Sequence, residues 1–213
     1  MFTGATILAD GAPALIMAAA KLVEVIDEPV LVKKRSRDFF WYSPILDRRL
    51  KTCFGDLVAR PKSPAELAMC LSLAARHRVP VTLRGGGTGN YGQSVPMDGG
   101  LIIDTTAMDD VLEIGSDFVR VRAGCNILKL NEALKEQGRE LPVFPSTQDI
   151  ATIGGFISGG SAGIGTVSHG MLRDAEIAVT VSIAEEARAV LGHPVALELL
   201  NAFDGGIAAP SAN

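Results

Sequence analysis

Two glycine-rich segments carry most of the chemistry that this sequence offers. The first spans residues 84–93 (RGGGTGNYGQ) and has five glycines within residues 84–92. The second spans residues 152–163 (TIGGFISGGSAG). Because glycine lacks a Cβ and adopts positive φ readily, its main-chain N–H groups can come close to a ligand. Two such segments, with few charged side chains, predict a site for a large, flat cofactor that carries phosphate groups.

The first segment fits neither common nucleotide-binding motif. Residues 87–92 match G-x-G-x-x-G after a predicted strand, but residues 94–100 (SVPMDGG) cannot begin the helix that a Rossmann fingerprint requires. No Gly-Lys-Ser/Thr follows, which excludes a P-loop. The remaining interpretation is a nest of N–H groups around a pyrophosphate, with hydrogen bonds from Thr88 and Asn90. Arg84 either adds a charge there or pairs elsewhere; the alternative to a site is a glycine-rich hairpin without a ligand.

The surrounding pattern predicts an α+β domain rather than a regular βαβ series. Residues 15–26 are expected to be helical and residues 33–38 to form a charged, solvated turn. The aromatic residues 39–42 are expected to anchor the chain, with a lid as the alternative. Ser63 and Glu66 form a capping box for a helix that ends near His77. Asn126 is expected to cap a second helix, closed by Gly138. Strands are expected at residues 57–59, 79–83, 101–104 and 118–123.

Composition narrows the function classes. The net charge of −4 argues against nucleic acid or an anionic membrane as a partner. Cys53, Cys70 and Cys125 form no metal motif, so we expect no metal site, three small buried side chains and a reducing, cytoplasmic location. Residues 150–168 carry no charge, but six glycines there disfavour a membrane-spanning helix. We therefore expect a buried cofactor loop in that stretch.

Five motifs follow one another along the chain: PKSPAE at 61–66, VPV at 79–81, RGGGTG at 84–89, PS at 145–146 and ATIGG at 151–155. In this order they resemble the FAD-binding domain of the vanillyl-alcohol oxidase / p-cresol methylhydroxylase superfamily. The likeness is greatest to its glycolate-oxidase-like and D-lactate-dehydrogenase-like members and covers residues 56–181.

The resemblance implies that the first segment wraps the FAD pyrophosphate, and that the second segment, with Pro145 and Ser146, lines the flavin ring and ribityl chain. Covalent members attach flavin through a histidine in the first loop or a cysteine in the second motif. Thr88 stands at the first position and the second motif has no cysteine, so we expect non-covalent FAD. The expected FAD contacts are Arg84, Gly85, Gly86, Gly87, Thr88, Gly89, Asn90, Pro145, Ser146, Thr152, Ile153, Gly154, Gly155, Ser158, Gly159 and Gly163.

The implied reaction is oxidation of a small-molecule 2-hydroxy acid or related alcohol by hydride transfer to flavin. We assign no catalytic residue; His169 is interpreted as an ordinary loop histidine. In this superfamily a separate cap domain, C-terminal to the FAD domain, holds the substrate, and the chain is expected to be truncated and inactive alone. Missing strands would leave sheet edges exposed, through which oligomers can form.

The C-terminal residues 192–213 resemble a different family, the threonylcarbamoyl-AMP synthases, with Ser211 and Asn213 at the matching nucleotide-site positions. The expected organisation is a lead-in (1–55), an incomplete FAD-binding domain of the p-cresol methylhydroxylase type (56–182) and a foreign-looking helical tail (183–213). The alternatives to an FAD module are a non-catalytic fusion remnant and residual nucleotide binding by the tail.

Overall fold

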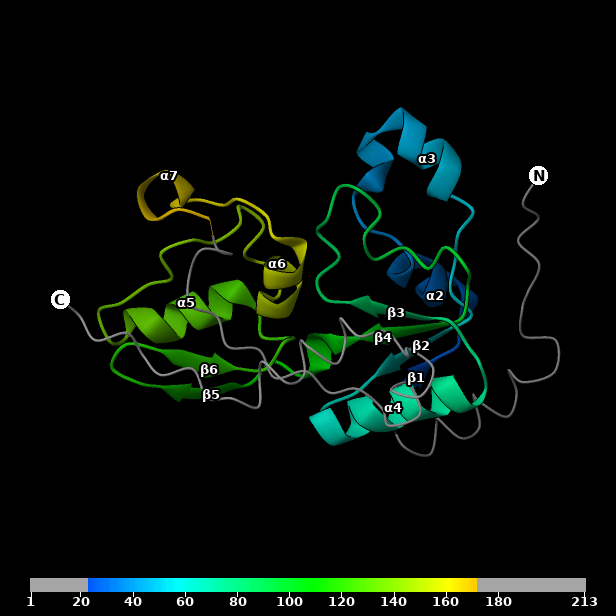
Figure 1. The fold of residues 1–213 in the computed structure, drawn as a ribbon, viewed down its shortest axis with the longest axis horizontal. Coiled ribbons are helices and arrows are strands. Elements are labelled where there is room, and N and C mark those ends of the chain that lie inside the picture. Colours follow the sequence, from blue (N-terminus) through cyan, green and yellow to red (C-terminus); the bar gives the residue numbers. More distant parts are fainter. Residues whose placement is uncertain (1–22, 172–213) are drawn as a thin grey trace, which may run out of the picture.

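The computed structural model describes residues 23–171, which form two lobes, each a small sheet with helices packed on it (Figure 1). The first lobe holds a four-stranded sheet in the order β1 (Glu24–Ile26), β2 (Leu57–Arg60), β4 (Leu101–Asp104), β3 (Val81–Arg84). Strands β2, β4 and β3 are parallel, while β1 runs antiparallel to β2. The observed α+β fold is the class that the sequence predicts.

The first lobe has a helix on each face of its sheet. Helix α4 (Pro64–Arg76) begins as the capping box predicts: Ser63 Oγ accepts a hydrogen bond from the Glu66 N–H at 3.2 Å. Its Cys70 and Ala74 pack with Leu57, Leu101 and other residues of the sheet. On the opposite face, Val32 of α2 (Pro29–Arg35) packs against Val58 and Ile102. The central strands β2 and β4 are therefore buried on both faces, as their continuous apolar sequences require.

The second lobe is built on the β5 (Val111–Ile114) and β6 (Val119–Val121) hairpin. Helix α5 (Ile127–Lys135) is capped by Asn126, whose Oδ1 accepts from the Lys129 N–H at 3.0 Å. Its Leu130 and Leu134 pack on the hairpin. The predicted strand at 118–123, the Asn126 cap and the helix of this lobe are confirmed, whereas strand β5 was not predicted.

The N-terminal region differs from expectation. Residues 24–26 form strand β1 instead of ending a helix; residues 15–22 lie outside the described part. The expected solvated turn at 33–38 is the end of α2 followed by a bend in which Ser36 and Asp38 are buried. In the aromatic run, Phe40 is fully buried and serves as the expected anchor, while Trp41 and Tyr42 are exposed. The chain continues through η1 (Phe40–Tyr42) and α3 (Pro44–Leu50).

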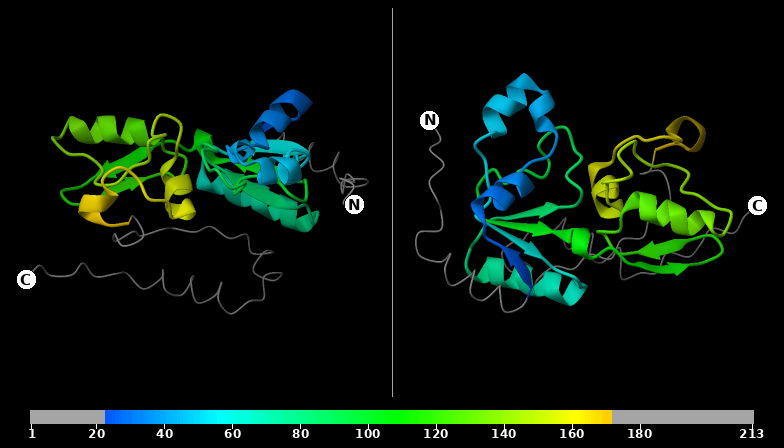
Figure 2. Two further views of the ribbon diagram at one scale, coloured as in Figure 1. Left: turned by 90° about the horizontal axis from the view of Figure 1, so that it is seen from above. Right: turned by 180° about the vertical axis from the view of Figure 1, so that it is seen from behind.

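The second glycine segment is also a correction, because most of it is helical rather than a loop. Helix α6 (Ile153–Gly159) starts at Thr152, whose side chain caps the Gly155 N–H, and it buries Phe156 against Ile127 and Val143. Apolar packing of that face outweighs the low helix propensity of its glycines. Helix α6 lies at the border between the lobes in all views (Figures 1 and 2). The remaining short helices are η2 (Thr105–Ala107) and α7 (Thr166–His169).

Between residues 23 and 171, none of the helices has the length and apolar character needed to cross a bilayer. The expected tail, residues 183–213, with its likeness to a second family, falls outside the described residues.

The three cysteines are free thiols, but they do not share one environment. Cys70 and Cys125 are buried, as expected, whereas Cys53 is only half-buried, which corrects the expectation for that residue. Burial raises the pKa of Cys70 and of Cys125 to about 11.

We therefore predict two classes of thiol reactivity near neutral pH. A thiolate is the reactive form, so Cys53 should react with a disulfide reagent in a fast phase, and Cys70 and Cys125 only after unfolding. The time course of thionitrobenzoate release measures this. Cys53→Ser should remove the fast phase, and three thiols reacting at one rate in the native protein would contradict the burial.

Candidate functional site

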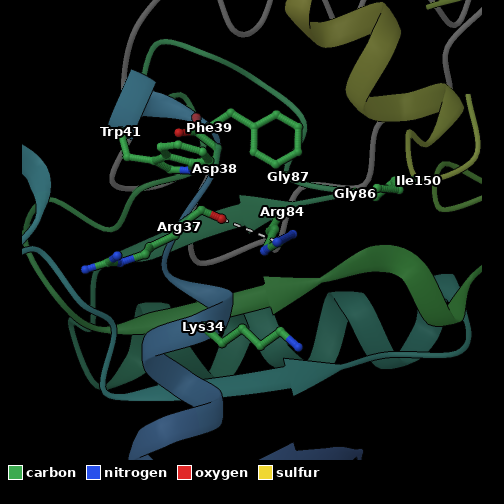
Figure 3. Close-up of a pocket in the computed structure, with 9 residues that line it drawn as sticks. All are labelled: Lys34, Arg37, Asp38, Phe39, Trp41, Arg84, Gly86, Gly87 and Ile150. Atoms are coloured by element: carbon green, nitrogen blue, oxygen red, sulfur yellow. Dashed lines mark hydrogen bonds between the residues drawn. The ribbon is translucent and has the colours of Figure 1, made fainter. Parts of the chain in front are cut away.

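The first glycine segment starts from a buried arginine. Arg84 is the last residue of β3, and its Nε donates to the carbonyl of Arg35 at 2.8 Å. Its Nη1 donates to the carbonyl of Gly85 at 2.8 Å and its Nη2 to that of Arg37 at 3.4 Å (Figure 3). Because Arg35 ends α2, the guanidinium satisfies a carbonyl at a helix C-terminus. Of the two roles considered for Arg84, the side chain performs the structural one.

Arg84 lies in a cluster of charged side chains together with Arg35 and Asp104. Asp104, fully buried at the end of β4, forms an ion pair with Arg35 at 2.9 Å. Burial lowers the pKa of Arg84, and the nearby Asp104 carboxylate opposes that shift. The cluster therefore joins the ends of β3, β4 and α2 at the place where the glycine loop begins.

The two glycine segments lie against each other. A Cβ on Gly85 would meet the side chain of Thr152, and one on Gly86 would meet the carbonyl of Ile150. A Cβ on Gly87, which has φ +68°, would meet the Arg84 guanidinium. These three glycines are thus required by the close approach of the protein to itself, and they bring the start of the second segment to the first loop.

The segments differ in their main-chain donors. Within residues 23–171, the N–H groups of Gly86, Gly87 and Thr88 donate no hydrogen bond. By contrast, the N–H of Ile153 donates to Cys125 at 2.9 Å and that of Gly154 to Ala123 at 2.8 Å. The first loop therefore has N–H groups available for an anion, while the first turn of α6 uses its own within the protein.

The far end of the first loop is tied to the segment after α2. The Phe39 N–H donates to the carbonyl of Gly89 at 2.7 Å, and the Asp38 carboxylate accepts from the Phe40 N–H at 2.8 Å. Burial raises the pKa of Asp38, and main-chain donors that include Phe40 and Gly92 oppose the shift. Asp38 and Phe39 thus fix the return of the loop, whose next residue, Asn90, is exposed.

A pocket of about 370 Å³ lies beside the loop (Figure 3). It is lined by Lys34, Arg37, Asp38, Phe39, Trp41, Arg84, Gly86, Gly87 and Ile150. Sequence reasoning chose only Arg84, Gly86 and Gly87 of this set. The signal for the rest was the run KKRSRDFFWY at 33–42, four cations in five residues followed by aromatics, which reads locally as an exposed turn.

The remaining residues that were predicted to contact FAD lie outside the pocket. Pro145 begins a turn in which the Gln148 N–H donates to its carbonyl at 3.1 Å, and Ser146 within that turn is exposed. Gly163 donates to Thr166 Oγ1 at 2.8 Å, and a Cβ on Gly163 would meet the carbonyl of Phe144. Ser158 and Gly159 are exposed at the end of α6. These residues do not line the pocket, and their contact with a cofactor stays a prediction.

Comparison with known protein families identifies the family to which this chain belongs. The model of one family, described as "FAD binding domain", matches residues 55–187, more than half of the chain. The chain belongs to this FAD binding domain family. The resemblance inferred from the motifs is thereby confirmed, and FAD is the cofactor of the fold.

Relatives of known name agree with this assignment. The chain is 34% identical over 131 residues to glycolate oxidase subunit GlcD of Bacillus subtilis, which covers 61% of this chain and 28% of the relative. It is 29% identical over 131 residues to D-lactate dehydrogenase of Archaeoglobus fulgidus, covering 61% of this chain and 29% of the relative. It is 35% identical over 134 residues to D-2-hydroxyglutarate dehydrogenase of Escherichia coli, covering 60% of this chain and 13% of the relative. The chain thus spans less than a third of each relative's length.

Solved structures support the fold alone. Alkyldihydroxyacetonephosphate synthase superposes with a TM-score of 0.68 at 21% identity, covering 78% of this chain and 35% of that one. p-Cresol methylhydroxylase superposes with a TM-score of 0.54 at 14% identity, covering 66% of this chain and 28% of that one. The FAD-binding fold of the p-cresol methylhydroxylase type is therefore confirmed.

The described residues fit the pyrophosphate of FAD at one place. The first loop offers donor N–H groups at Gly86, Gly87 and Thr88, and Gly87 lies against the Arg84 guanidinium. When bound, FAD supplies an isoalloxazine ring that accepts two electrons. The chain's own contribution is to hold and orient that group.

The packing of the two segments predicts that Gly86→Ala destabilises the fold. Gly86 does not have positive φ, so the added methyl acts through its collision with the main chain of Ile150 and Ala151. We expect a loss of about 1–3 kcal/mol in the free energy of unfolding, measured by urea titration.

Gly159→Ala is the matched control, because its Cβ would meet only Ser161 Oγ, at 3.4 Å. It should change the free energy of unfolding by no more than about 0.5 kcal/mol. Equal stability of the two variants would mean that the segments do not touch as described.

Proposed function

We propose that this chain is the FAD-binding module of a flavin-dependent oxidoreductase that oxidises a 2-hydroxy acid or a related alcohol, with FAD held non-covalently. The observation that carries the proposal is the first glycine loop. Its N–H groups at residues 86–88 have no acceptor among residues 23–171, and two of these residues, Gly86 and Gly87, line the pocket. Successive main-chain donors without acceptors suit a diphosphate. Threonine at position 88 and the lack of cysteine in residues 145–163 support non-covalent binding.

The substrate class is taken from the relatives' names. Glycolate, D-lactate and D-2-hydroxyglutarate are all 2-hydroxy acids. Because the chain covers only 13–29% of these three proteins, substrate binding and oxidation are proposed for the assembled enzyme, with this chain supplying the cofactor site. We assign no catalytic base within it.

The proposal also covers the location of the protein in the cell and its association into oligomers. A cytoplasmic location is supported by the free thiols of Cys53, Cys70 and Cys125. Oligomer formation through a sheet edge is supported by strand β3, the last strand in the order of its sheet, which exposes the apolar side chains of Val81 and Leu83.

The test is flavin binding by the purified full chain. We expect a flavin absorbance band after incubation with FAD and desalting, and a higher melting temperature with FAD. FAD at 100 times its dissociation constant would add about 2.7 kcal/mol of stability. Acid precipitation should release the flavin into the supernatant, because no covalent bond retains it.

Nicotinamide at the same concentration, which has neither a diphosphate nor a flavin ring, is the control ligand and should leave the melting temperature unchanged. A chain that melts identically with and without FAD would sink the proposal and favour the fusion-remnant alternative. A shift with ATP that Ser211→Ala removes would instead favour nucleotide binding by the tail.

A further inference from the structure

Among the residues that line the pocket beside the first glycine loop, Asp38 is the one acid, and it is buried. Asp38 is 3% exposed and lines the pocket together with Gly86 and Gly87 (Figure 3). Under the proposed function, the main chain of these two glycines binds a diphosphate, which is an anion. A buried carboxylate beside a bound diphosphate is unfavourable, because like charges repel and buried charges are screened less than exposed ones. The charge of Asp38 must therefore be compensated or removed when the diphosphate binds.

The two carboxylate oxygens of Asp38 differ in their partners. Oδ1 accepts a hydrogen bond from the Phe40 N–H at 2.8 Å. Oδ2 is also buried, and no donor within residues 23–171 meets it in hydrogen-bond geometry. A Cβ on Gly89 would lie 3.3 Å from Oδ2, so the loop packs directly on this oxygen. A proton on Oδ2 therefore neutralises the group without removing the hydrogen bond that holds Phe40.

The surroundings of Asp38 favour its neutral form. Burial raises the pKa of its carboxyl, and the main-chain N–H groups of Phe40 and of residues 92–94 oppose this shift. Asp38 forms no ion pair within residues 23–171. The side chain is thus closer to protonation near neutral pH than an exposed aspartate is.

Three cations offset the charge of Asp38. Lys34 and Arg37 line the pocket, and Arg84, at the end of β3, interacts with the carboxylate through its charge. The loop that packs on Asp38, residues 85–95, carries no ionisable side chain except that of Tyr91, and η1 carries only that of Tyr42; both are exposed. A bound diphosphate interacts with the same cations and adds negative charge, so it raises the pKa of Asp38 further.

We propose that FAD binding to this chain takes up a proton from solvent, and that the proton goes to Oδ2 of Asp38. The inference rests on the proposed function. It gives the control of that site to a residue outside the family match, which begins at residue 55. The diphosphate is then bound beside a neutral carboxyl group. Because the free protein loses this proton as the pH rises, FAD affinity falls as the pH rises through the pKa of Asp38.

Calorimetric titration of the full chain with FAD, in two buffers of different ionisation enthalpy, measures the proton uptake directly. FAD itself has no group that titrates near neutral pH. We expect the binding enthalpy to differ between the buffers in the sense of proton uptake, and the affinity to fall as the pH is raised from about 5 to 8. The fall should be roughly tenfold if bound FAD raises the pKa of Asp38 by about one.

Asp38→Asn keeps an acceptor for the Phe40 N–H but cannot titrate. It should abolish the proton uptake and bind FAD with an affinity that does not depend on pH. At the alkaline end of the range it should bind at least as tightly as the unaltered chain, whereas loss of a merely structural support would weaken binding at every pH. Asp56→Asn is the matched control, because Asp56 Oδ2 accepts from the Gly100 N–H at 2.6 Å in the same lobe but does not line the pocket. It should retain both the uptake and the pH dependence.

The outcomes separate this inference from the proposed function. FAD binding without proton uptake, or uptake that survives Asp38→Asn, would overturn the inference and leave the proposed function standing. No FAD binding by the unaltered chain at any pH would overturn both. If Asp38→Asn does not fold, the carboxyl resonances of isotope-labelled aspartate in the unaltered protein decide. FAD should raise the pKa of one aspartate carboxyl, and identical titration curves with and without FAD would overturn the inference.

Discussion

The hydrogen bonds of the Arg84 guanidinium are the interaction on which the rest of this arrangement depends. One side chain connects the end of β3, the first residue of the glycine loop and the carbonyls of Arg35 and Arg37 at the end of α2. A buried guanidinium is costly unless its donors are satisfied and its charge is balanced. Here three carbonyls satisfy donors on all three nitrogens, and Asp104 balances the local charge through Arg35. The loop therefore leaves the sheet from a fixed point.

The glycines of the first loop have two physical functions that a sequence motif does not separate. Gly85, Gly86 and Gly87 allow the chain to pack against Thr152, Ile150 and Arg84 itself. The same packing leaves the N–H groups of residues 86–88 without acceptors among the described residues. Close approach to the protein's own backbone thus produces the donor surface that a diphosphate requires. The second segment behaves differently, because its first turn is helical and bonded to residues 123 and 125.

The candidate site is consequently assembled from three parts of the chain that are distant in sequence. Residues 34–41 supply cations and aromatic rings, residues 84–87 supply main-chain donors and the buried arginine that fixes them, and Ile150 closes one side. Of these, only residues 84–87 and Ile150 fall within the FAD binding domain match. The glycine loop, which lies within the family match, and residues 34–41, which lie outside it, therefore meet in one pocket.

The sequence alone determined the elements whose signals are local. The Ser63–Glu66 capping box, the Asn126 cap, the apolar strand 101–104 and the glycine loop after β3 all depend on neighbours within a few residues, and each was predictable. Residues 33–42 show the limit: their charges indicate a solvated turn, yet Asp38 and Phe40 are buried, and the Phe39 N–H is bonded to the glycine loop at Gly89. Likewise, glycines that disfavour a helix in isolation form α6 because Phe156 has a core to enter. Tertiary structure alone decided which of the polar residues meet at the pocket, since burial and partner choice depend on contacts between distant parts of the chain.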